Sequence, residues 1–197
     1  DNIDTEWAIG VMIASCPDFP EFEGRMLTAI AQDRGWTIED AVREVVTSPR
    51  GRQVICIQFI IDEADIETNL RHPRMLVGSD GIPQLKGMPH PRLFGTMPRV
   101  LARYVRERHV LSLEEAIRRM TSASCERFGL LDRGLVKEGC WADLVLFDPD
   151  TVEDLATYED SKREPKGIAM VVVNGQIAYE DGRHTGVGSG RALRFKR

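Results

Sequence analysis

The 197-residue sequence lacks the paired cysteines of a zinc ribbon or a disulfide framework. Its four cysteines are widely spaced, and none of them belongs to a C-x-x-C pair. Long apolar runs are also missing, because no stretch approaches the roughly 20 residues that span a bilayer. The acidic start DNIDTEW does not have the character of a signal peptide. We therefore expect reduced thiols, no membrane segment and a cytoplasmic location.

The chain has no excess of positive charge. Lysine and arginine number 26 against 31 aspartates and glutamates, which gives a formal net charge of -5, and the two signs are mixed along the chain and not segregated. A nucleic-acid-binding domain needs a basic face, so we expect no nucleic-acid partner. The segment GVGSGR (186–191) follows no convincing strand and matches no phosphate-binding loop.

The first half of the sequence predicts an alternation of strands and helices. A Thr37 N-cap with Asp40 three residues later opens one helix, whose apolar stripe includes Val45 and Val46, and Gly35 ends the helix before it. The apolar run QVICIQFII (53–61) is typical of a strand buried on both faces. In order, we expect a strand at 7–14, helices at 23–33 and from 37, a strand at 53–61, a helix at 62–70 and a strand at 74–77.

The last two strands and the helix between them predict a parallel βαβ unit. Gly78-Ser79-Asp80-Gly81 would then lie at the carboxyl end of its second strand, where parallel sheets bind ligands. Beyond it we expect a long loop at 82–98, helices at 100–107 and 112–127, and strands at 134–139, 142–148 and 168–182. Asn174-Gly175 predicts a hairpin in the last of these. A domain boundary is expected near residue 132, and the tail from 186 to 197 is expected to be loosely held.

The triplet His-Pro-Arg occurs twice around that turn, at residues 72–74 and 90–92. Asp80 between the copies can bind a metal or shuttle a proton, although Ser-Asp-Gly is also an ordinary turn sequence. In the second copy, Arg92 can present a planar fork to a carboxylate. His90 can act as a ligand or general acid, or it can be a loop histidine bonded to backbone. The first copy, at His72, is expected to be a structural turn that enters the strand.

Several motifs together resemble one enzyme family. LVGSDG, HPRLFGTMPRVLARYVRE, LSLEEAIRRMTSASCERFGL, DRGLVKEGCWADLVLFDPDTV and VVVNGQ are similar, in this order, to the C-terminal half of N-acyl-D-amino-acid deacylases (D-aminoacylases) of the amidohydrolase superfamily. The resemblance implies an α/β fold: the C-terminal part of a (β/α)8 barrel plus a small β-sandwich domain. Residues 1–131 would hold the last barrel strands and helices with a lid insertion that includes 1–20, and residues 132–197 the sandwich and tail.

The resemblance also implies a reaction and a set of site residues. A zinc-dependent enzyme would hydrolyse an N-acyl-D-amino acid to a carboxylate and a D-amino acid. Asp80 would touch the metal, take a proton from the attacking water and deliver it to the leaving amine. Arg92 would contact the substrate carboxylate, with Ser79 and His90 as further substrate-binding residues. None of the four histidines matches the family's other metal ligands, so those ligands are expected upstream of this chain.

Two alternatives to this function stay open. One is a cyclic amidohydrolase similar to dihydroorotase or hydantoinase, and the other is a non-catalytic scaffold or oligomerisation fragment. A barrel takes about 250 residues, more than this chain provides. We therefore expect the chain alone to be inactive and to associate either with the missing N-terminal part of the enzyme or with itself.

Overall fold

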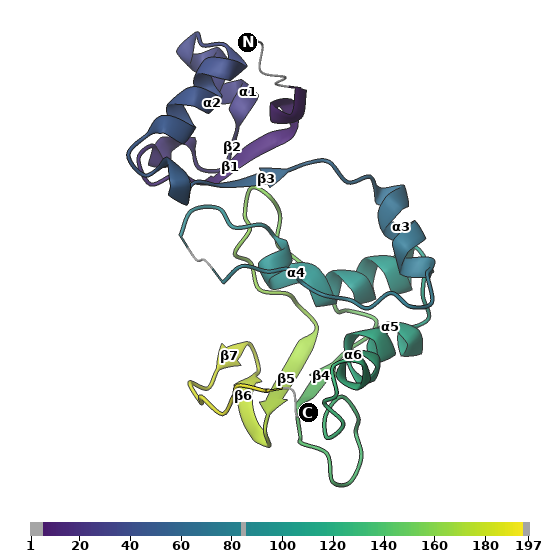
Figure 1. Cartoon of the computed structure of the whole chain (residues 1–197). Coiled ribbons are helices and arrows are strands. Elements are labelled where there is room, and N and C mark those ends of the chain that lie inside the picture. The colour runs from purple at the N-terminus through teal and green to yellow at the C-terminus, as the bar shows by residue number, and fades with distance from the viewer. Residues whose placement is uncertain (1–5, 84–85, 195–197) are drawn as a thin grey trace. The chain divides into compact units, whose positions relative to one another are not determined.

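A computed structural model describes residues 6–83 and 86–194 and combines short helices with two antiparallel sheets (Figure 1). The chain divides into two compact units. The first contains the chain up to Asp62 together with Asp80–Phe94 and Ala156–Arg163, and the second contains Glu63–Ser79, Gly95–Leu155 and the chain from Glu164 onward. In the described part of the chain, no helix is long and apolar enough to cross a membrane.

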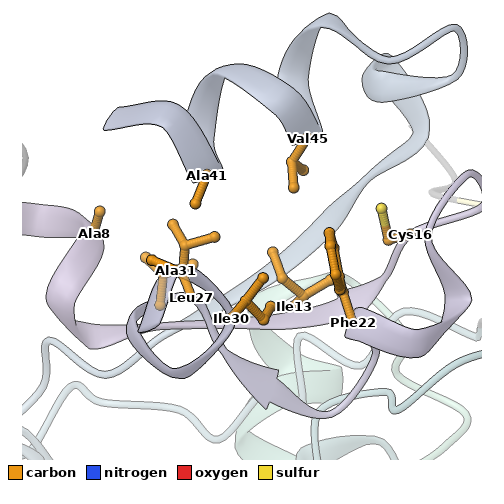
Figure 2. Packing of buried hydrophobic residues seen from close by; sticks show 10 residues of the cluster. Ala8, Ile13, Cys16, Phe22, Leu27, Ile30, Ala31, Ala41 and Val45 are labelled. Atoms are coloured by element: carbon orange, nitrogen blue, oxygen red, sulfur yellow. The ribbon is translucent and has the colours of Figure 1, made fainter. Parts of the chain in front are cut away.

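The first unit is built around strand β1, which is buried along its whole length. The sheet order is β2-β1-β3, and both pairings are antiparallel. Helices α1 and α2 cover this sheet, and Figure 2 shows Ala41 and Val45 of α2 pointing toward the buried side chains of α1 and β1. The elements are η1 (Glu6–Gly10), β1 (Val11–Ser15), η2 (Pro20–Phe22), β2 (Arg25–Met26), α1 (Leu27–Arg34), α2 (Ile38–Thr47), η3 (Gly51–Gln53) and β3 (Ile55–Gln58).

The predicted end of the first helix and start of the second are confirmed, but the first helix begins at Leu27 and not at residue 23, because Arg25–Met26 form β2. The Thr37 side chain accepts a hydrogen bond from the Asp40 amide, and the Asp40 carboxylate accepts one from the Thr37 amide. Gly35 ends α1 in the left-handed conformation, with φ of 65°. The prediction that Val46 is buried is wrong, since its exposed fraction is 62% and the buried residues of α2 are Ala41 and Val45. The predicted strand at 7–14 begins only at Val11, after the 3-10 turn of η1.

The predicted parallel βαβ unit does not form among the described residues. β3 is shorter than the predicted strand at 53–61 and pairs antiparallel with β1, and the side chains of Ile60 and Ile61 are each 71% exposed. Residues 74–77 form no strand, although the predicted helix before them is present as α3 (Glu63–Arg71). A strand requires hydrogen bonds from a neighbouring strand, and the described residues supply none here. Met75 and Val77 pack instead against a helical core that includes Leu70.

The helices of the second half follow the predictions in part. Helix α4 begins at Arg92, inside the predicted loop at 82–98, and contains Pro98; residues 84 and 85 of that loop lie outside the described residues. The helix predicted at 112–127 begins as expected with the Ser112 side chain accepting from the Glu115 amide, but it breaks at Thr121 into two helices. The helices are α4 (Arg92–Arg99), the π-helical η4 (Val100–Glu107), α5 (Leu113–Met120) and α6 (Ser122–Arg127).

The second sheet is a four-stranded antiparallel meander in the order β4-β5-β6-β7. Asn174 and Gly175, with φ of 48° and 80°, form the predicted hairpin turn between β5 and β6. The segment 134–139 is not the predicted strand, because glycines with φ of 80° and 85° turn the chain at both of its ends. The strands are β4 (Leu144–Phe147), β5 (Ile168–Val173), β6 (Gln176–Glu180) and β7 (Arg183–His184).

Candidate functional site

The loop that carries the second His-Pro-Arg triplet is fixed to the end of β1. The Met88 amide donates a hydrogen bond to the Ala14 carbonyl over 2.7 Å. At Gly87, whose φ is 69°, a Cβ atom would lie 2.3 Å from the same carbonyl oxygen. A side chain at Gly87 would therefore prevent this approach, and the glycine allows the loop to lie directly against the strand.

Asp80 and Arg92 form an ion pair across this loop. An Asp80 carboxylate oxygen lies 2.8 Å from the Arg92 guanidinium, and the exposed fractions of the two side chains are 82% and 37%. Asp80 adopts a left-handed backbone with φ of 47°, which aspartate tolerates better than most residues. The structure thus does not place Asp80 at the end of a strand, and this chain alone does not shield the carboxylate from water. Ser79, directly before it, is half-buried.

The His90 ring is bonded to backbone, which is one of the two arrangements that the sequence left open. Its Nδ1 accepts a hydrogen bond from the Arg92 amide over 3.0 Å. Its Nε2 lies 3.4 Å from the Tyr158 hydroxyl oxygen. Burial lowers the pKa of His90, the Arg92 cation lowers it further, and the Asp80 carboxylate opposes both. These causes favour the neutral ring at pH 7.

Tyr158 is a neighbour of this site that the sequence interpretation missed. Its ring meets the ring of His90 edge to face, with centroids 5.3 Å apart, and that of Phe59 at 4.6 Å. It also packs against the small core of Met12 and Ile57. No local signal could have identified Tyr158, since 68 residues separate it from His90.

The first His-Pro-Arg triplet lies elsewhere and has a different environment. The Arg74 amide donates to the His72 Nδ1 atom over 3.3 Å, as in the second triplet. The His72 carbonyl, however, accepts a hydrogen bond from the guanidinium of Arg119, whose side chain is only 5% exposed. This copy forms the turn that ends α3, so it is structural as expected, although no strand follows it.

The described residues do not make up a complete metal site. Within 6–83 and 86–194, no three His, Cys, Asp or Glu side chains gather closely enough to hold an ion. Asp80, with its exposed carboxylate, can contribute one oxygen ligand to a zinc ion, which accepts carboxylate oxygens alongside histidine and cysteine. The remaining ligands would have to come from outside the described residues.

The chain is similar to known proteins in both sequence and fold. Residues 22–179 match the model of the Amidohydrolase family. A D-aminoacylase of Alcaligenes xylosoxydans xylosoxydans is 42% identical over 182 residues, which cover 92% of this chain and 36% of the relative. The chain therefore spans about a third of the length of the curated relative that it matches.

Two solved structures have the same fold over nearly the whole chain. A crystal structure of D-aminoacylase superimposes with a TM-score of 0.86 at 41% identity and covers 96% of this chain and 39% of its own. The N-acyl-D-glutamate deacylase of Bordetella bronchiseptica, solved with zinc and a phosphonate mimic of the tetrahedral intermediate, gives a TM-score of 0.78 at 37% identity and covers 88% and 35%. The resemblance seen in the motifs is thus confirmed by both sequence and fold.

Proposed function

This chain belongs to the amidohydrolase family, and we propose that it forms part of a zinc-dependent enzyme that hydrolyses N-acyl-D-amino acids to a carboxylate and a D-amino acid. Its similarity to D-aminoacylase over 92% of its length supports this substrate class. The observation that carries the proposal is the pairing of Asp80 and Arg92 on one loop, since it puts a proton carrier beside a carboxylate-binding cation. The finer architecture, a sector of a (β/α)8 barrel with a β-sandwich divided near residue 132, belongs to the same proposal.

Asp80 and Arg92 perform complementary steps in this proposal. When bound, zinc supplies a Lewis acid beside the scissile amide. Asp80 takes a proton from the attacking water and delivers it to the nitrogen of the leaving amine, so that the carboxylate ends the cycle as it began. Arg92 binds the substrate carboxylate through its planar fork, and Ser79 contacts the substrate next to it. Closure of the site by the rest of the enzyme would exclude water, which reaches Asp80 freely here.

A hybrid enzyme tests this proposal. In the hybrid, the part of D-aminoacylase that this chain matches is replaced by this chain. We expect zinc-dependent hydrolysis of N-acetyl-D-amino acids, but no hydrolysis of their L-enantiomers or of dihydroorotate. The 197-residue chain alone, supplied with zinc, should be inactive. A folded, zinc-loaded hybrid that is inactive would support a scaffold role, and one that opens only dihydroorotate would support a cyclic amidohydrolase.

Replacing Asp80 tests its catalytic role within the hybrid. Asp80→Asn should abolish turnover, because the amide cannot carry the proton, while zinc content measured by metal analysis stays nearly unchanged. Asp181→Asn is the matched control, since Asp181 is another exposed aspartate with positive φ, here 49°, and lies in the second unit. Unchanged turnover in Asp80→Asn would refute the role of Asp80.

Exposed apolar residues support the expected association with further protein. Val145 and Leu146 of β4 are 55% and 60% exposed, and Ile60 and Ile61 of the first unit are each 71% exposed. Exposed apolar surface of this kind is typical of interaction sites. We therefore expect the isolated chain to self-associate in sedimentation experiments, and a concentration-independent monomer would contradict this.

A cytoplasmic location also belongs to the proposal, supported by four free thiols.

A further inference from the structure

The hydrogen bonds of the His90 ring determine where its proton is held. A neutral imidazole carries one N–H, and its other nitrogen accepts. Since the Arg92 amide donates to Nδ1 over 3.0 Å, the proton must be on Nε2. Nε2–H then points to the Tyr158 hydroxyl oxygen, 3.4 Å away, as a donor. The backbone of the loop thereby fixes one tautomer, and both ring nitrogens have partners.

Tyr158 is well placed to hold the ring in this orientation. Its own ring is in edge-to-face contact with the rings of Phe59 and His90, with interplanar angles of 63° and 74°. It packs beside Ile57 of β3 and Met12 of the buried strand β1. Tyr158 is therefore held against the sheet of the first unit by these contacts.

We infer that Tyr158 and His90 form a positioning pair that orients Arg92 for binding the substrate carboxylate. The Tyr158 hydroxyl contacts Nε2 of the His90 ring and fixes the orientation of the ring. Nδ1 of the same ring accepts a hydrogen bond from the amide of Arg92 at the start of α4. The Arg92 guanidinium is thereby directed toward Asp80. Neither Tyr158 nor His90 contacts the reacting atoms. The inference rests on the proposed function, and it assigns His90 an indirect role in place of direct substrate contact.

The first triplet shows that the local bond alone does not make such a pair. His72 has the same bond from its Nδ1 to the amide two residues later, but the residue is exposed. Among the described residues, no tyrosine ring stacks on it. The contact with the tyrosine is thus one difference between the two triplets, and the Arg74 amide of the first provides an internal control.

Nuclear magnetic resonance of the isolated chain tests the pair without any catalysis. Long-range proton–nitrogen spectra should show His90 with a protonated Nε2 and an unprotonated Nδ1. Tyr158→Phe should lower the protection of the Arg92 amide against hydrogen exchange about 5-fold, the worth of one ordinary hydrogen bond, and leave that of Arg74 unchanged. Tyr179→Phe is the control, because Tyr179 meets His184 in a similar edge-to-face contact, 5.2 Å between centroids, outside the site.

Two substitutions of His90 separate its two contacts and do not depend on the folding of the tyrosine variant. His90→Asn can still accept from the Arg92 amide, as asparagine does in a turn, but it loses the tyrosine contact. His90→Ala loses both. Protection of the Arg92 amide should fall in the order wild type, His90→Asn, His90→Ala. A protonated Nδ1, or equal protection in all variants, would overturn the inference.

In the hybrid enzyme, Tyr158→Phe should raise KM for an N-acetyl-D-amino acid about 5-fold and leave kcat within 2-fold, because only binding of the carboxylate is weakened. A fall in kcat with unchanged KM would overturn the positioning role. The two proposals fail separately: an inactive hybrid contradicts the proposed function and leaves the tautomer result standing, whereas the wrong tautomer contradicts the pair and leaves the function standing.

Discussion

The two His-Pro-Arg triplets have the same sequence and the same local hydrogen bond but different surroundings. In each, the arginine amide donates to Nδ1 of the histidine two residues earlier, over 3.3 Å at His72 and 3.0 Å at His90. The first triplet is held by a buried arginine and ends a helix, whereas the second lies against a tyrosine and carries Arg92 toward Asp80. Local sequence thus determines the turn, and distant residues determine what the turn is used for.

Removal of Arg119 should give the largest loss of stability. Its guanidinium donates to the carbonyls of Leu70 and His72 over 2.6 and 3.0 Å and pairs with Glu115. Arg119→Ala removes this buried donor from both carbonyls and leaves Glu115 with Arg118, so the free energy of unfolding should fall by about 3 kcal/mol in urea titrations. Arg118→Ala is the matched control: Arg118 pairs with the same glutamate but is 48% exposed, and the change should stay below about 1 kcal/mol. Equal losses would refute the anchoring of the first triplet.

The anchor of the second triplet should respond to Gly87→Ala. The new Cβ would meet the Ala14 carbonyl at 2.3 Å, in addition to the strain of a positive φ, so we expect a loss of about 2 kcal/mol of stability in thermal unfolding. In Gly35→Ala, φ is also positive, at 65°, but no atom lies within 4 Å of the new Cβ. The loss there should be about 1 kcal/mol, from backbone strain alone. A smaller loss at Gly87 than at Gly35 would contradict the contact.

The smallest expected effect is a dependence of stability on pH. Burial and Arg92 lower the pKa of His90 in the folded chain, and Asp80 opposes them. As the pH decreases through the ordinary value of 6.5, the unfolded chain therefore takes up a proton more readily than the folded chain. The contribution of His90 to the free energy of unfolding is thus complete above pH 6.5 and falls as the pH decreases toward the pKa of the folded chain. His90→Asn should remove this slope in unfolding experiments between pH 7.5 and 5.5, whereas His72→Asn should leave it in place. An identical slope in both variants would exclude His90 as its source.

Features that depend on neighbours in the sequence could be predicted. The Thr37 cap, the Gly35 stop and the Asn174-Gly175 hairpin all involve bonds or backbone angles within a few residues. Asp80 and Arg92 were also found from sequence, because turn chemistry and the resemblance to a family mark them. Their roles stay predictions.

Features that depend on distant neighbours could not be predicted. The apolar runs at 53–61 and 74–77 are typical of buried parallel strands, yet one pairs antiparallel with β1 and the other forms no strand in the described residues. Strand pairing depends on which segments are available as neighbours, and an apolar pattern does not specify them. The contact of Tyr158 with His90 was missed for the same reason.

Comparing Arg92→Lys with Arg74→Lys in the hybrid enzyme tests the central claim most directly. Lysine keeps the charge but not the planar fork, so Arg92→Lys should lower kcat/KM for an N-acetyl-D-amino acid about 10- to 100-fold, the worth of a charged hydrogen bond. Arg74→Lys, in the structural copy, should leave kcat/KM unchanged within 2-fold. Equal values for the two variants would show that the second triplet is only a turn, as the first is.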